Sequence, residues 1–63
     1  MESDRATLSA LATTLDELTT RMTAVADGYQ HTPREDIANG LYDVERSLRA
    51  ASRRLERVLR SMR

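Results

Sequence analysis

The chain has 63 residues, which is enough for one domain and close to the lower limit for a stable hydrophobic core. It contains no Cys, which excludes a disulfide framework and thiolate chemistry. With two Tyr and neither Trp nor Phe, it offers little for an aromatic platform that stacks bases. Two Gly and one Pro provide too few turns for an all-β fold. Ten Arg balance ten acidic residues, so the net charge by itself predicts no binding to polyanions.

The first predicted element is a helix over residues 3 to 27, approximately. Strongly apolar residues recur there at alternating spacings of three and four, which is the pattern of the a and d positions of a heptad repeat. These residues, the first seam, are Leu8, Leu11, Leu15, Leu18, Met22 and Val25.

A short loop is predicted at about residues 28–32. Gly28 can adopt the left-handed backbone conformation that ends a helix, because it has no Cβ. Thr32 then reads as the N-cap of the next helix, with Pro33 at the first helical position and Glu35 completing a capping box. A loop of this length places the two helices side by side and antiparallel.

The second predicted helix covers residues 33 to 62, approximately, and carries a second seam. Gly40 lies inside it; we favour a continuous helix over one that begins only after this glycine. The fold class is therefore all-α, an antiparallel, coiled-coil-like two-helix hairpin. We expect the two seams to meet along the hairpin, with Leu18 level with Leu41–Val44. The second seam consists of Ile37, Leu41, Val44, Leu48, Ala51, Leu55, Val58 and Met62.

A hairpin of this size is expected to need a partner. Two helices cover only half of each other's seam, and ordering so many residues costs more free energy than that burial provides. The outward positions of the first helix are mainly Ala, Ser and Thr, which allow close helix approach. We therefore expect a homodimer that forms a four-helix bundle; the alternative is a solvated helix that is merely rich in Thr and Ala. The expected interface comprises Leu8, Ala10, Leu11, Thr14, Leu15, Leu18, Met22, Leu41, Tyr42, Leu48, Leu55 and Leu59.

The charges are distributed unevenly along the chain. Residues 1–45 carry three Arg against nine acids, a net charge of −6, and residues 46–63 carry seven Arg against one acid, a net charge of +6. An Arg stripe with this spacing fits a solvated surface with some pairing between subunits, a nucleic acid, or an acidic protein or membrane surface. We favour the first of these; nucleic acid is not favoured. The candidate residues for binding an anionic partner are Arg46, Arg49, Arg53, Arg54, Arg57 and Arg60.

The residues offer almost no catalytic chemistry. His31 is the only His and is expected to be an exposed loop residue, and the acidic residues lack the spacing of a calcium loop. We therefore expect a non-enzyme with no cofactor and no metal. With neither a signal peptide nor a membrane span evident, the expected location is the cytoplasm. The function hypotheses are an interaction or regulatory module that self-associates and binds a protein partner, and a small nucleic-acid-binding regulator that uses the Arg stripe.

Overall fold

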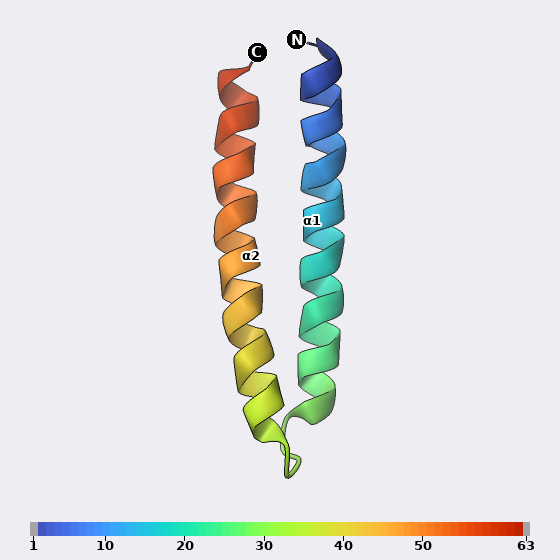
Figure 1. The fold of residues 1–63 in the computed structure, drawn as a ribbon, viewed down its shortest axis with the longest axis vertical. Helices are drawn as coiled ribbons and strands as arrows, with labels where there is room; N and C mark the ends of the chain where they lie inside the picture. Colours follow the sequence, from blue (N-terminus) through green and yellow to red (C-terminus); the bar gives the residue numbers. More distant parts are fainter. Residues whose placement is uncertain (1, 63) are drawn as a thin grey trace.

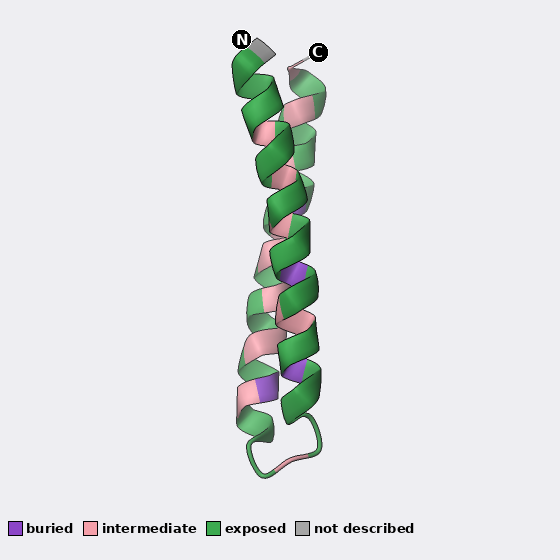
Figure 2. Cartoon of the chain, turned by 90° about the vertical axis from the view of Figure 1, so that its right-hand side faces the viewer, coloured by how far each residue is buried: buried purple, intermediate pink, exposed green. Residues whose placement is uncertain are grey.

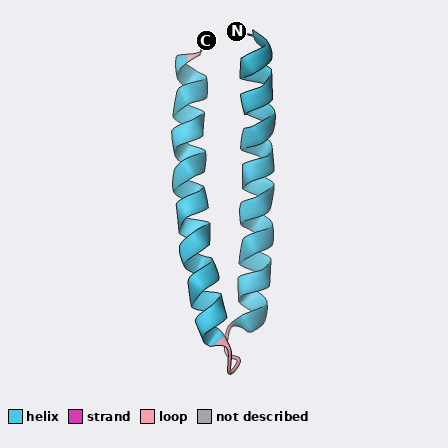
Figure 3. Cartoon of the chain, viewed as in Figure 1, coloured by secondary structure: helices cyan, strands magenta, loops and turns pink. Residues whose placement is uncertain are grey.

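The computed structural model describes residues 2–62, which form two antiparallel helices joined by a short loop (Figures 1 and 3). Helix α1 spans Glu2–Tyr29 and helix α2 spans Glu35–Ser61. The all-helical hairpin is confirmed, and the described part of the chain contains no strand. Its Cα atoms extend over 49 × 14 × 10 Å, so the molecule is a single layer of two helices.

The loop differs from the prediction. α1 continues through Gly28, and the residue with a left-handed backbone is His31, with φ of 62°. The N-cap of α2 is Arg34, which makes no side-chain cap. The Thr32 hydroxyl instead accepts a hydrogen bond from the Arg34 N–H, and the Glu35 carboxylate accepts one from the His31 N–H, each over 3.2 Å. The predicted capping residues are thus used within a turn that begins two residues later than expected.

Threonine is frequent in α1 although its branched side chain disfavours helices. The structure shows how these side chains are accommodated: each of several hydroxyls donates a hydrogen bond to the carbonyl oxygen four residues earlier. These residues are Thr7, Thr13, Thr14, Thr19, Thr20 and Thr23. The helix therefore satisfies these hydroxyl groups itself, except that the Thr23 hydroxyl shares its proton between Thr19 and Glu45 on α2.

The helices meet along one line of residues on each, which we call the contact positions. Thr19 and Ser52, at the centre of this line, are 5% and 9% exposed, and Ala26 and Ala38 are fully buried (Figure 2). Every one of these four side chains is small, and no large side chain in the described region is fully buried. The contact positions are Leu8, Ala12, Leu15, Thr19, Met22 and Ala26 on α1, and Ala38, Leu41, Glu45, Leu48, Ser52, Leu55 and Leu59 on α2.

The expectation that the two seams meet along the whole hairpin holds only for alternate members, as the expected half-coverage of each seam implies. Leu8, Leu15 and Met22 do face α2, but Leu11 and Leu18, the alternate members of the seam, are about half exposed. The helices instead meet through Ala12, Thr19 and Ala26, the small residues that directly follow the alternate seam members of α1.

The predicted register was also displaced. Hydrogen bonds place Asp16 level with Ser52 and Thr23 level with Glu45, so Leu18 lies opposite the region near residue 50 rather than Leu41–Val44. The later turn between the helices accounts for part of this shift.

The uninterrupted course of α2 through Gly40 is confirmed and leads to a stability prediction. A Cβ built on Gly40 meets no atom within 4 Å, so alanine fits in the hairpin without strain. We expect Gly40→Ala to raise the free energy of unfolding by about 0.5–1 kcal/mol, because glycine is the poorer helix former. Chemical denaturation measures this change. A lower stability would contradict the expectation and would mean that another helix occupies this space.

Candidate assembly interface

The two sides of the hairpin differ in chemistry, and the contact positions define them. An α-helix turns by 100° per residue, so the residues before and after a contact position lie on opposite sides of the hairpin. Because the helices are antiparallel, preceding residues from both helices share one side and following residues share the other. Thr20 and Arg53, which follow Thr19 and Ser52, indeed line the same hollow.

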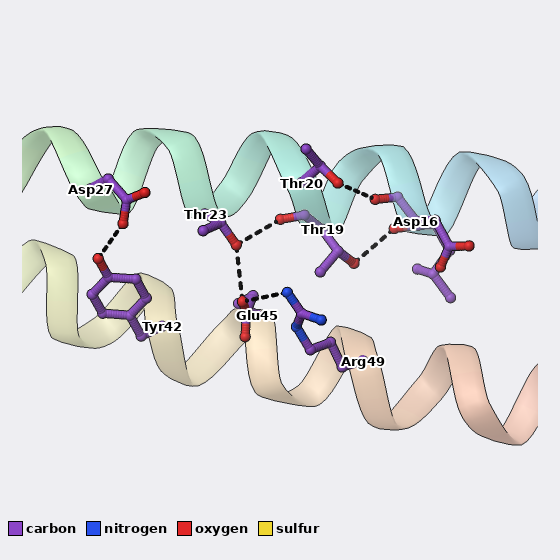
Figure 4. Close-up of polar contacts among 9 residues, drawn as sticks. Asp16, Thr19, Thr20, Thr23, Asp27, Tyr42, Glu45 and Arg49 are labelled. Carbon is purple, nitrogen blue, oxygen red and sulfur yellow. Dashed lines mark hydrogen bonds and ion pairs between the residues drawn. The ribbon is translucent and has the colours of Figure 1, made fainter.

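The following residues form what we call the polar side, where hydrogen bonds join the helices. The Tyr42 hydroxyl donates to Asp27 Oδ1 at 2.5 Å, and the Thr23 hydroxyl donates to Glu45 Oε2 at 2.9 Å (Figure 4). Ser52 donates to Asp16 Oδ1 at 3.1 Å. These three bonds are spread along the hairpin and fix the register of α2 against α1.

Glu45 is the one acidic residue at a contact position. Its side chain is only 14% exposed, and its carboxylate is held between the Thr23 hydroxyl and the Arg49 guanidinium, the latter at 3.1 Å (Figure 4). A carboxylate that is largely buried needs such partners because burial removes its water. Glu45 is therefore a structural residue, and one cation of the predicted Arg stripe is engaged in holding it.

The Tyr42–Asp27 hydrogen bond makes the stability of the hairpin dependent on pH. Donation to Asp27 favours the neutral phenol and raises the pKa of Tyr42 above its usual value, with partial burial and the charge of Asp27 adding to the effect. The stabilisation is complete below the ordinary tyrosine pKa of about 10 and is lost as the pH rises through the higher folded value. We expect the thermal midpoint to decline above about pH 10 in the native chain and much less in Tyr42→Phe.

Thermal unfolding followed by circular dichroism between pH 8 and 11, approximately, tests this expectation. Tyr29→Phe is the matched control, since it also removes one phenol but leaves the bond to Asp27 in place. An equal decline in the Tyr42→Phe and Tyr29→Phe proteins would contradict the assignment of the effect to Tyr42.

The Arg stripe is divided between two surfaces. Arg46, Arg49, Arg53 and Arg60 directly follow contact positions and lie on the polar side. Arg54 and Arg57 are farther around α2, and Arg54, which directly precedes the contact position Leu55, borders the opposite side. Arg49 and Arg53 line a hollow of about 320 Å³ on the polar side, together with Asp16, Thr19, Thr20 and Ser52. Arg46 pairs with Asp43 on its own helix. Two of the six candidate Arg side chains, Arg46 and Arg49, are therefore paired with carboxylates on their own helix.

The opposite side of the hairpin is apolar. Leu11, Leu18 and Val25 precede contact positions on α1, and Val44, Ala51 and Val58 precede them on α2; we call these six residues the apolar side. Its five large side chains are between 43% and 53% exposed. The one other exposed large hydrophobic residue in the described region is Tyr29, which follows Leu18 by three helical turns and lies on the same side.

The structure distributes the predicted interface residues over three places. Leu11 and Leu18 lie on the apolar side, Thr14 borders it, and Ala10 is exposed farther around α1. The remaining eight lie between the two helices of the hairpin or beside that contact: Leu8, Leu15, Met22, Leu41, Tyr42, Leu48, Leu55 and Leu59. The predicted interface omitted the other four members of the apolar side, although all four belong to the sequence seams.

Residues 2–62 bring together no group of three or more metal-ligating side chains, and neither helix is long and apolar enough to cross a membrane. No protein-family model matches the chain, and searches of curated proteins and of solved structures give no significant match.

Proposed function

We propose that the chain is a non-enzymatic interaction or regulatory module that self-associates as a homodimer, completing a four-helix bundle, and presents its outer surfaces to a protein partner. The observation that supports this most strongly is the absence of an interior. A stable domain buries its apolar surface between at least two layers, and this hairpin is one layer with no large side chain fully buried among its described residues. Association supplies the missing layer.

Subunit capture tests the proposal. An affinity-tagged copy and an untagged copy are mixed, incubated at a temperature that allows exchange, and recovered on the tag. After random exchange of equal amounts, we expect about one untagged copy to be retained for every two tagged copies, and retention to fall when the mixture is diluted. A tagged chain carrying Leu18→Glu serves as the control. Recovery of the tagged copy alone at micromolar concentration would refute self-association.

Nucleic-acid binding is the second candidate, and the observation in its favour is that Arg53 and Arg60 lie on the polar side, away from the apolar side. Binding through phosphates falls steeply with salt, with a slope set by the number of contacts. If the chain binds duplex DNA, the double substitution Arg53→Ala/Arg57→Ala should reduce the slope of log binding constant against log salt concentration by about two. If the protein changes the electrophoretic mobility of neither single-stranded nor duplex DNA and RNA at low salt, the nucleic-acid candidate is eliminated.

A further inference from the structure

We propose that the surface used for self-association is the apolar side, and that its occupant is the apolar side of one second copy of this chain. The inference rests on the proposed self-association and specifies the surface and the number of copies. It differs from the sequence-based interface by including Val25, Val44, Ala51 and Val58 and by leaving the outer surface of α1, with Ala10, exposed.

The residues of the apolar side repeat with the seven-residue spacing that is typical of core positions in helical bundles. Its members are seven residues apart on each helix, and the register set by the Asp16–Ser52 and Thr23–Glu45 bonds brings them into layers. Leu11 lies level with Val58, Leu18 with Ala51, and Val25 with Val44, with neighbouring layers about 10 Å apart. Each layer supplies two side chains, so a second hairpin completes layers of four.

The surface area also matches one further copy. The hairpin exposes 4810 Å². A compact protein of 7.1 kDa is expected to expose about 4100 Å². The excess of about 700 Å² is close to the 800 Å², approximately, that each partner buries in an interface of standard size. An interface of standard size with one further copy would therefore remove most of this excess.

The chemistry of the apolar side favours self-pairing over a charged partner. None of its six positions carries a charge. Its border is mixed, since Thr14 and Ser47 are small and polar whereas Arg21 and Arg54, seven residues farther along each helix, are charged. The small residues let two helices approach to about 8–10 Å, and long Arg side chains at such an edge keep their charged ends in water. A second copy placed by a two-fold axis covers the whole apolar side of both hairpins, so the assembly closes as a dimer with the two polar sides facing outward.

Label distances and mass test this together, and the absence of Cys from the chain makes single labels straightforward. A nitroxide is attached at Ser47→Cys, beside the apolar side, and in a separate protein at Thr20→Cys, on the polar side. In a bundle with helices about 10 Å apart, we expect the two Ser47 labels within roughly 20 Å of each other and the two Thr20 labels more than about 20 Å apart. The mass expected is twice 7.1 kDa.

The outcomes separate this inference from the proposed function. Close Thr20 labels with distant Ser47 labels would overturn the surface while leaving self-association intact, and so would a dimer whose Ser47 and Thr20 distances are equal. A mass of three or more chains would overturn the closed dimer. A monomer at every concentration would refute the proposed self-association and this inference together.

Discussion

The Leu11→Glu/Leu18→Glu protein is expected to be monomeric and to lose most of its helical signal. Both side chains lie on the apolar side and are 51% and 46% exposed in the single hairpin. Full burial of a leucine contributes about 2 kcal/mol, and association supplies about half of that because these side chains are already half-buried in the single hairpin. The dimer contains four of these leucines, so roughly 4 kcal/mol of association is removed before any cost of burying carboxylates. Analytical ultracentrifugation and circular dichroism measure the two effects.

A matched protein, Thr13→Glu/Thr20→Glu, adds the same charge to the same helix. Each substituted residue lies two positions after its leucine counterpart and is exposed away from the apolar side. Each hydroxyl bonds only to a backbone carbonyl of α1, so its loss affects no contact with another helix. We expect this protein to remain dimeric and helical. Equal dissociation of both double variants would assign the effect to charge alone and contradict the role of the apolar side.

Leu48→Ala is expected to lower the free energy of unfolding by about 2–3 kcal/mol. Leu48 is half-buried at a contact position between α1 and α2, and in a four-helix bundle it also faces the second hairpin. Truncation of a leucine in a closed core removes its burial and leaves a cavity, whereas truncation of a leucine open to water costs less. Urea denaturation at fixed protein concentration gives the value.

Asn39→Ala is the control for Leu48→Ala, because Asn39 is exposed on α2 and has no side-chain partner among the hydrogen bonds of the described residues. Its effect is expected to stay within about 0.5 kcal/mol. A cost below about 1 kcal/mol for Leu48→Ala would mean that water reaches this position and that no second layer covers it.

The sequence was sufficient to predict the hairpin because long heptad seams leave few alternatives. Six apolar residues in α1 and eight in the second seam share one spacing, and Pro33 with its polar neighbours separates them. The turn was less predictable. Gly28 and Tyr29 both tolerate helical conformation, and the left-handed residue is His31, a residue type less common in that conformation than the glycine on which the prediction relied.

The two sides of the hairpin were not predicted for a different reason. A heptad seam shows which residues are apolar but not which of them face the partner within the chain. That choice depends on small residues at the contact positions, such as Ala26, Thr19 and Ser52, which let the helices pack closely there and turn Leu18 and Val25 outward. Alanine, threonine and serine at regular spacing gave no such signal, since residues of the same kind cover the outer surface of α1.

The most direct test of the central claim is the mass of the native chain over a dilution series, with circular dichroism on the same samples. The account predicts a helical species of twice the single-chain mass at micromolar concentration, with mass and helicity lost together on dilution. A helical monomer that keeps its signal at every concentration would contradict the account, because it would show that one layer of two helices is stable without a second.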